Sequence, residues 1–183
     1  MKFETQKEKL KDSRFTLHAS GFSLLETLVA VGILIGAVLG PLSLASSSIN
    51  AASLAKNQII ATNLAAEAME IVRNKRDSNI FQGSDWLFGL TSCAEPESCF
   101  VDIPQIPPYD YDIESCAPAC PALKRNPDTG LFNVQTGEDM GFIRKITITY
   151  LASDEIKVQV EISWKEKNSI SSFVLETYLF RWH

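Results

Sequence analysis

The chain has 183 residues, about the length of one domain. Hydrophobic residues make up 45% and charged residues 21%, a composition typical of a folded protein. The formal net charge of −5 lacks the basic excess of most nucleic-acid binders. Both histidines, His18 and His183, lie near the ends, which disfavours a His-dependent nucleophile or a His-ligated metal. We therefore expect that the protein is not an enzyme and that it binds no metal ion, cofactor or nucleic acid.

A basic segment and a long apolar run open the chain. Residues 1–21 carry five basic and three acidic side chains, so residues 22–183 have a net charge of −7. The following 24 residues, 22–45, contain one charged side chain, Glu26. As a helix they would be about 36 Å long, enough to cross a bilayer core of about 30 Å. Because basic residues precede this run, the positive-inside rule places the N-terminus in the cytoplasm and everything after Ala45 outside it.

Residues 1–45 also fit a secretory signal, because Ser43-Leu44-Ala45 is an acceptable cleavage site. Cleavage there would release residues 46–183 as a soluble binding domain, and an uncleaved run would be a plain anchor. Glu26 argues against a generic signal, since a carboxylate in an apolar run costs on the order of 2.5–3.5 kcal/mol on insertion. Such a residue usually has a functional partner.

The residues around that carboxylate form a specific motif. The octapeptide Gly21-Phe22-Ser23-Leu24-Leu25-Glu26-Thr27-Leu28, after a short charged leader, resembles the processing motif of type IV pilins and type II secretion pseudopilins. The resemblance implies that a prepilin peptidase at the inner membrane cuts between Gly21 and Phe22 and methylates the new amino group of Phe22. It also implies that Glu26 pairs with the N-terminal amine of a neighbouring subunit. A buried carboxylate is tolerable when such a cation is in contact with it.

An amphipathic segment follows the apolar run. No proline or glycine occurs from Ile49 to Arg76. Apolar side chains recur there at helical spacing, forming one stripe: Ile60, Leu64, Ala68 and Ile71. We predict a single helix from Phe22 to about Arg76, whose apolar half is 22–45 and whose amphipathic half is 46–76.

Two details of this helix are predicted as well. A kink or local unwinding is expected around Gly36, Gly40 and Pro41, because proline removes a backbone hydrogen bond. The cations Arg73, Lys75 and Arg76 are expected in the last turn, where they would favour the negative end of the helix dipole.

Residues 77–141 are predicted to be a loop-rich region. Seven of the eight prolines lie in 96–127 and all four cysteines in 93–120. Proline-rich backbone disfavours helix and central strand. Outside the cytoplasm, an even number of cysteines favours two disulfides, for which three pairings exist. We prefer the nearest-neighbour pairing, and the candidate residues are Cys93, Cys99, Cys116 and Cys120. A four-cysteine zinc site, which the spacing of the first two fits less well, and free thiols are the alternatives.

The C-terminal residues 142–183 read as three strands. From Ile156 to Trp164, apolar and polar side chains alternate with a period of two, which predicts a strand with one buried face. Similar patterns precede and follow it, separated by short turns, so an antiparallel three-stranded meander is favoured. The even-numbered face of the middle strand is the expected seat for the helical stripe.

A second resemblance covers much of the chain outside 80–135. Residues 63–77, 142–146, the strand around Trp164 and Thr177–Trp182 are similar to minor pilins of the type IV pilus modification (PilV-like) group. Type II minor pseudopilins share this outline. The resemblance implies an α+β, pilin-like fold, in which the long N-terminal helix packs on a C-terminal antiparallel sheet.

The two resemblances together imply a place and a role for the protein. They imply a single-pass protein of the bacterial inner membrane with its C-terminal domain outside the cytoplasm. Its partners would be the prepilin peptidase, other pilins or pseudopilins and the inner-membrane assembly platform. It would then enter a pilus or pseudopilus, with a priming or tip role.

Overall fold

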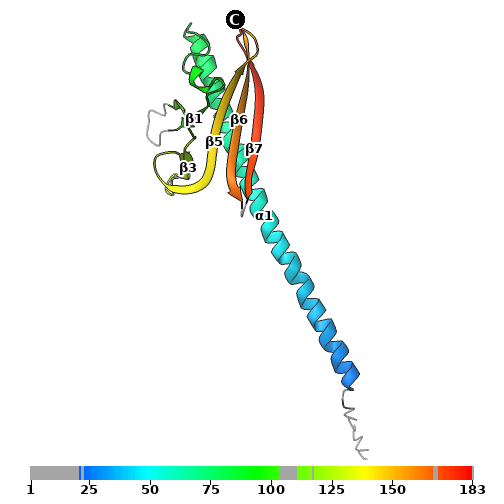
Figure 1. Ribbon diagram of the computed structural model, residues 1–183. Coiled ribbons are helices and arrows are strands. Elements are labelled where there is room, and N and C mark those ends of the chain that lie inside the picture. The colour runs from blue at the N-terminus through cyan, green and yellow to red at the C-terminus, as the bar shows by residue number, and fades with distance from the viewer. Residues whose placement is uncertain (1–20, 22, 104–110, 117, 167–168, 183) are drawn as a thin grey trace, which may run out of the picture. The chain divides into compact units, whose positions relative to one another are not determined.

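A computed structural model describes residues 21, 23–103, 111–116, 118–166 and 169–182 (Figure 1). The long helix α1 (Leu24–Phe81) is followed by the short 3-10 helix η1 (Thr91–Cys93) and by an antiparallel sheet. The chain divides into two compact units, of which the first ends at Ile49 and the second begins at Asn50. The expected α+β class, with one long N-terminal apolar helix and a sheet after it, is therefore found.

The first unit contributes the apolar part of α1. Every side chain from Leu24 to Ile49 is exposed, although most of them are apolar. The helix continues through Pro41, so the local unwinding predicted there is absent. Proline removes one N–H donor and is tolerated inside apolar helices when the neighbouring backbone adjusts.

The second unit begins with the remainder of α1, which packs on the sheet. Ala61, Leu64, Ala65, Ala68, Met69, Ile71 and Val72 are buried and share one core with the sheet. This agrees with the predicted stripe, except that Ile60 is only half-buried.

The end of α1 lies further along the chain than predicted. The helix ends at Phe81, and its last turn carries no basic side chain. The predicted placement of Arg73, Lys75 and Arg76 in the last turn is therefore wrong. The residues after Arg76 contain no helix breaker before Gly83, which has a φ of 69°. A glycine with this left-handed backbone is the usual residue just beyond a helix end.

Three long strands form the main part of the sheet. They are β5 (Glu138–Tyr150), β6 (Glu155–Glu166) and β7 (Ser169–Phe180), and each pairs antiparallel with the next. On β6 the side chains of Ile156, Val158, Val160, Ile162 and Trp164 are all buried, as the alternation predicted. The opposite face of the three strands is polar for most of its length and carries the ion pairs Lys145–Glu161 and Lys157–Glu176.

The sheet is larger than the three strands predicted, because residues 77–141 add four short ones. They are β1 (Cys99–Asp102), β2 (Asp112–Ser115), β3 (Ala122–Arg125) and β4 (Phe132–Asn133). Strand β1 pairs with β2 and β5, and β3 pairs with β4 and β5. The described prolines of this region, Pro96, Pro118, Pro121 and Pro127, lie outside the strands, where they cost no ladder hydrogen bond. The sequence did not predict these four short strands within the region.

Two disulfides hold this added layer. Cys93 of η1 is bonded to Cys99 of β1, and Cys116 after β2 is bonded to Cys120 before β3. This is the nearest-neighbour pairing, and it leaves no cysteine thiol free for zinc.

Candidate functional site at the start of the apolar helix

The peptide bond proposed for cleavage lies immediately before α1. Gly21 is exposed and not helical, and no other part of the described chain comes within 4 Å of the position that a side chain would take there. Phe22, the expected site of methylation, lies outside the described residues. The bond after Gly21 thus adjoins an exposed residue three positions before the helix begins at Leu24.

Ser23 caps the first turn of the helix. Its Oγ accepts a hydrogen bond of 3.2 Å from the backbone N–H of Glu26, and its carbonyl accepts one of 3.1 Å from the N–H of Thr27. Serine followed three residues later by glutamate is the capping-box pattern. Sequence reasoning missed Ser23, although this spacing was readable in the motif itself.

Glu26 lies in the first turn of α1 with its side chain exposed. The positive end of the helix dipole favours a carboxylate in this position. Within the described part of the chain the Glu26 side chain has no ion-pair partner, whereas Glu67 and Glu70 of the same helix each pair with an arginine. Its negative charge is therefore available to a cation from another molecule.

The helix surface beyond Glu26 is apolar and open. By length and composition α1 can cross a membrane, with a mean hydropathy of 2.4 over its most apolar 18 residues. Gly32, Gly36 and Gly40 follow one another at intervals of four. Apart from the helix's own backbone, no described atom lies within 4 Å of the position that a side chain would take on any of them. Residues four apart fall on one face of a helix, so this face has an open strip of small residues.

A buried arginine in the second unit was not predicted from the sequence. Arg144 of β5 has no exposed side-chain surface, and its Nη1 donates a 2.6 Å hydrogen bond to the Glu67 carboxylate. Its Nη2 donates a 2.8 Å hydrogen bond to the Val101 carbonyl of β1. Arg144 therefore joins three elements, α1, β1 and β5, which fixes how the helix packs on the sheet.

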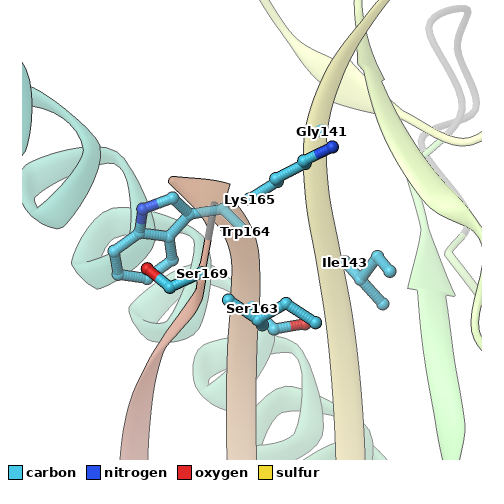
Figure 2. Close-up of a pocket in the computed structure, with 7 residues that line it drawn as sticks. Gly141, Ile143, Ser163, Trp164, Lys165 and Ser169 are labelled. Atoms are coloured by element: carbon cyan, nitrogen blue, oxygen red, sulfur yellow. The ribbon is translucent and has the colours of Figure 1, made fainter. Parts of the chain in front are cut away.

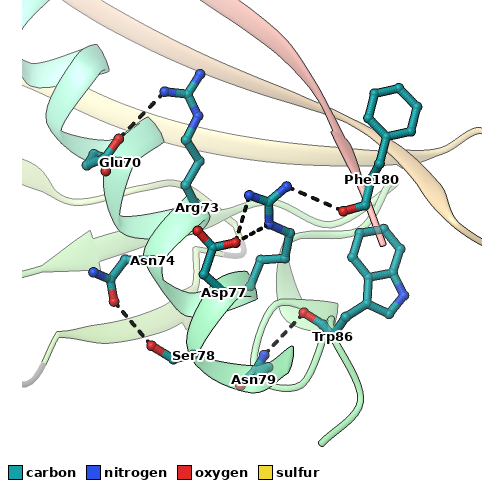
Figure 3. Close-up of polar contacts among 9 residues, drawn as sticks. Glu70, Arg73, Asn74, Asp77, Ser78, Asn79, Trp86 and Phe180 are labelled. Atoms are coloured by element: carbon teal, nitrogen blue, oxygen red, sulfur yellow. Dashed lines mark hydrogen bonds and ion pairs between the residues drawn. The ribbon is translucent and has the colours of Figure 1, made fainter. Parts of the chain in front are cut away.

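A second polar cluster fixes the end of α1 (Figure 3). Arg76 pairs with Asp77 at 2.7 Å, and its Nη1 donates to the carbonyl of Phe180 at the end of β7. The Asn79 side chain donates to the carbonyls of Trp86 and Phe88, which holds the chain as it leaves the helix. These contacts hold the end of α1 against β7 and against the segment that follows the helix.

The structure brings Gly21 and Glu26 to the same end of α1 and places the four cysteines far along the chain in the second unit. Among the described side chains, no group of three or more His, Cys, Asp or Glu is arranged to hold a metal ion. Comparisons of the chain with protein-family models, with curated proteins and with solved structures found no match.

Proposed function

We propose that this chain is a minor type IV pilin or pseudopilin with a pilin-like fold. The observation that carries the proposal is the exposed Gly21 just before a capped apolar helix, whose first turn presents the Glu26 carboxylate with no ion-pair partner among the described side chains. A prepilin peptidase of the inner membrane would hydrolyse the bond between Gly21 and Phe22 and methylate the new amine. The protein would be its substrate and not itself an enzyme.

Cleavage would create a positive charge, the N-terminal ammonium group, that can pair with the Glu26 carboxylate. Hydrolysis after Gly21 leaves an ammonium group on Phe22, four residues before Glu26. A carboxylate in an apolar layer is costly alone, and a cation in contact removes much of that cost. Because the Glu26 side chain is exposed, a neighbouring subunit's N-terminus can reach it. Pairing of this kind would align one subunit against the next in a filament.

The apolar surface of α1 supports assembly through helix packing. Small residues at intervals of four let helix backbones approach closely in an apolar environment. The strip of Gly32, Gly36 and Gly40 offers such a surface, and large apolar side chains flank it. Other pilins or pseudopilins, and the assembly platform of the inner membrane, are the partners that this surface suits.

The second unit suits a location outside the cytoplasm. It holds two disulfides, which persist in oxidising compartments. The charge of −7 carried by residues 22–183 matches neither a nucleic-acid-binding tip nor a cytoplasmic, positively charged flank. The helix would cross the inner membrane once before the subunit enters the pilus or pseudopilus.

The N-terminus of the protein tests the proposal directly. Intact-mass and peptide mass spectrometry of the chain, purified from cells that have a prepilin peptidase, should find a first residue of N-methylated Phe22. A start at Ser46 would overturn the proposal in favour of a secreted binding domain. A start at Met1 would indicate a plain membrane anchor.

Substitution of Glu26 tests the pairing. Glu26→Ala should leave cleavage largely intact and reduce incorporation into filaments at least about tenfold, because the neighbour's amine loses its partner. Glu70→Ala is the matched control, since Glu70 is an exposed carboxylate of the same helix that pairs with Arg73. Immunoblots of sheared filaments give the measurement. Equal incorporation of the two variants would contradict the pairing.

A further inference from the structure

The end of the β6–β7 hairpin at which β6 finishes and β7 begins exposes an apolar side chain. Ile170, at the start of β7, is 81% exposed, more than any other large hydrophobic side chain described in the strands. In the sheet it lies opposite Lys165 of β6. An exposed isoleucine beside a lysine suits an environment that is apolar inside and charged at its surface, because the lysine can keep its ammonium group in the polar layer.

A hollow of about 380 Å³ adjoins this pair on the sheet surface (Figure 2). Its lining includes Gly141 and Ile143 of β5 and Ser163 of β6. Gly141 leaves the floor open, and Ile143 adds a second partly exposed apolar side chain. Figure 2 shows the Lys165 side chain reaching across toward β5, with its ammonium group at the rim. The hollow is thus apolar inside, with one cation at its edge.

The same hairpin end lies close to where the second unit begins. A neighbouring hollow of about 280 Å³ is lined by Lys165 and Glu166 together with Asn50, Ser53, Leu54 and Asn57 of α1. Asn50 follows Ala45, the last residue of the apolar run, by five positions. Five residues span at most about 18 Å even when fully extended, and about 7.5 Å in a helix. Asn50, which lines this hollow, is therefore at most about 18 Å from Ala45, the end of the apolar run.

We propose that the end of the β6–β7 hairpin docks on the lipid bilayer surface. Ile170 enters the interface between headgroups and acyl chains, and the Lys165 ammonium binds headgroup phosphate. The contact would hold the second unit against the membrane surface. This inference depends on the helix crossing a membrane and not on the assignment as a pilin.

The bilayer is a better occupant of this surface than a second copy of the chain. The Lys165 ammonium at the rim of the hollow suits the phosphate groups of lipid headgroups. A bilayer crossed by the apolar run would end within a few residues of Asn50, which lines the neighbouring hollow.

Site-specific fluorescence tests the proposal in the full chain. The four native cysteines form disulfides, so a single introduced cysteine can be labelled without reductant. Ile170→Cys carries the environment-sensitive dye NBD, and Tyr178→Cys is the matched control. Tyr178 is 54% exposed, on the same face of β7, and eight residues along the strand, which is about 26 Å away. Both side chains are exposed, so neither substitution should disturb the core.

Both labelled proteins are reconstituted in vesicles of phosphatidylcholine and phosphatidylglycerol. Phospholipids brominated near the headgroup should quench the dye at position 170 at least about threefold more than the dye at position 178. Equal quenching at the two positions would overturn the proposal. Shielding at position 170 that rises with the protein-to-lipid ratio, without quenching by bromine, would overturn it in favour of a second copy.

A second variant isolates the cation. Lys165→Glu in the Ile170→Cys protein should reduce quenching in vesicles that contain phosphatidylglycerol, because an acidic side chain is repelled by the anionic headgroups. Unchanged quenching in this variant would overturn the role given to Lys165. Neither measurement depends on processing of the N-terminus, so failure here and failure of the pilin assignment are distinguishable.

Discussion

The two parts of α1 have different surroundings although both are rich in apolar side chains. Between Leu24 and Ile49 every side chain is exposed, whereas seven apolar side chains between Ala61 and Val72 lie in a core shared with the sheet. Burial of apolar surface contributes about 25 cal/mol per Å². The second part obtains this stabilisation within the chain, and the first part needs lipid or other helices to obtain it.

This difference separates the residues that stabilise the fold from those that serve assembly. A substitution in the buried part should change the free energy of unfolding of the second unit. A substitution in the exposed part should leave that free energy unchanged and alter only membrane or filament behaviour. The predictions below test this division, and each uses the full chain in mild detergent unless another setting is named.

The largest loss of stability is expected from Arg144→Ala. Its guanidinium is fully buried and bridges Glu67 and Val101, so its removal leaves Glu67 without its cation and opens a cavity. We expect a loss of about 3–5 kcal/mol in the free energy of unfolding. Denaturant titration followed by the fluorescence of Trp86 and Trp164, both 5% exposed, gives the measurement.

The neighbouring residue supplies the control for Arg144. Lys145 lies on the opposite face of β5, is 42% exposed and pairs with Glu161 at 2.7 Å. Because an exposed ion pair contributes little, Lys145→Ala should cost less than about 1 kcal/mol. If Arg144→Ala and Lys145→Ala lowered the free energy of unfolding equally, the buried guanidinium would contribute no more stability than an exposed ion pair.

Leucine truncation compares the two parts of α1 directly. Leu64 is 3% exposed in the core, and Leu34 is 65% exposed in the apolar run. Leu64→Ala should lower the free energy of unfolding by about 3 kcal/mol, since it removes buried methyl groups and leaves a cavity. Leu34→Ala should change it by less than about 0.5 kcal/mol. Similar losses in the same denaturant titration would contradict the division of the helix.

Removal of a disulfide should have a smaller effect, also confined to the second unit. The Cys116–Cys120 bond closes a short loop between β2 and β3. The double variant Cys116→Ala/Cys120→Ala should therefore lose about 2 kcal/mol, as expected for the loop entropy released in the unfolded chain. Denaturant titration without reductant gives the value, and wild type treated with reductant should lose at least as much. No loss in either sample would show that the bond does not stabilise the unit.

Periodicity made the long elements predictable. The stripe along α1 repeats over three turns, and the alternation on β6 covers nine residues, from Ile156 to Trp164, so both patterns are long enough to identify. Strands β1 to β4 have two to four residues each, too few for a period to emerge. Their pairing with β5 is set by tertiary contacts and disulfides that the linear sequence does not display.

The part of the candidate site that consists of neighbouring residues in the sequence was predictable. Gly21, Phe22 and Glu26 form one contiguous motif, and their residue types and spacing can be read directly. Arg144 could not be recognised in the same way, because its partner Glu67 is 77 residues away and an arginine in a strand is usually exposed. Only the fold shows that the Arg144 side chain is buried and that Glu67 neutralises its charge.

Ser23 tests the boundary of the exposed part, with the smallest expected effect. Its Oγ accepts from the N–H of Glu26, so Ser23→Ala leaves one donor of the first turn without that partner. We expect the first turn to lose about 1 kcal/mol, while the unfolding of the second unit is unchanged. Hydrogen exchange of the amides from Leu24 to Leu28, in bilayer discs, should accelerate by about fivefold. Ser47→Ala is the control, because the Ser47 hydroxyl donates to the carbonyl of Ser43 in the middle of the helix and so does not cap its end. Acceleration in the control at residues 24–28, or none in Ser23→Ala, would show that the capping bond does not define where the helix begins, and the position of Glu26 in a stable first turn would then lack its support.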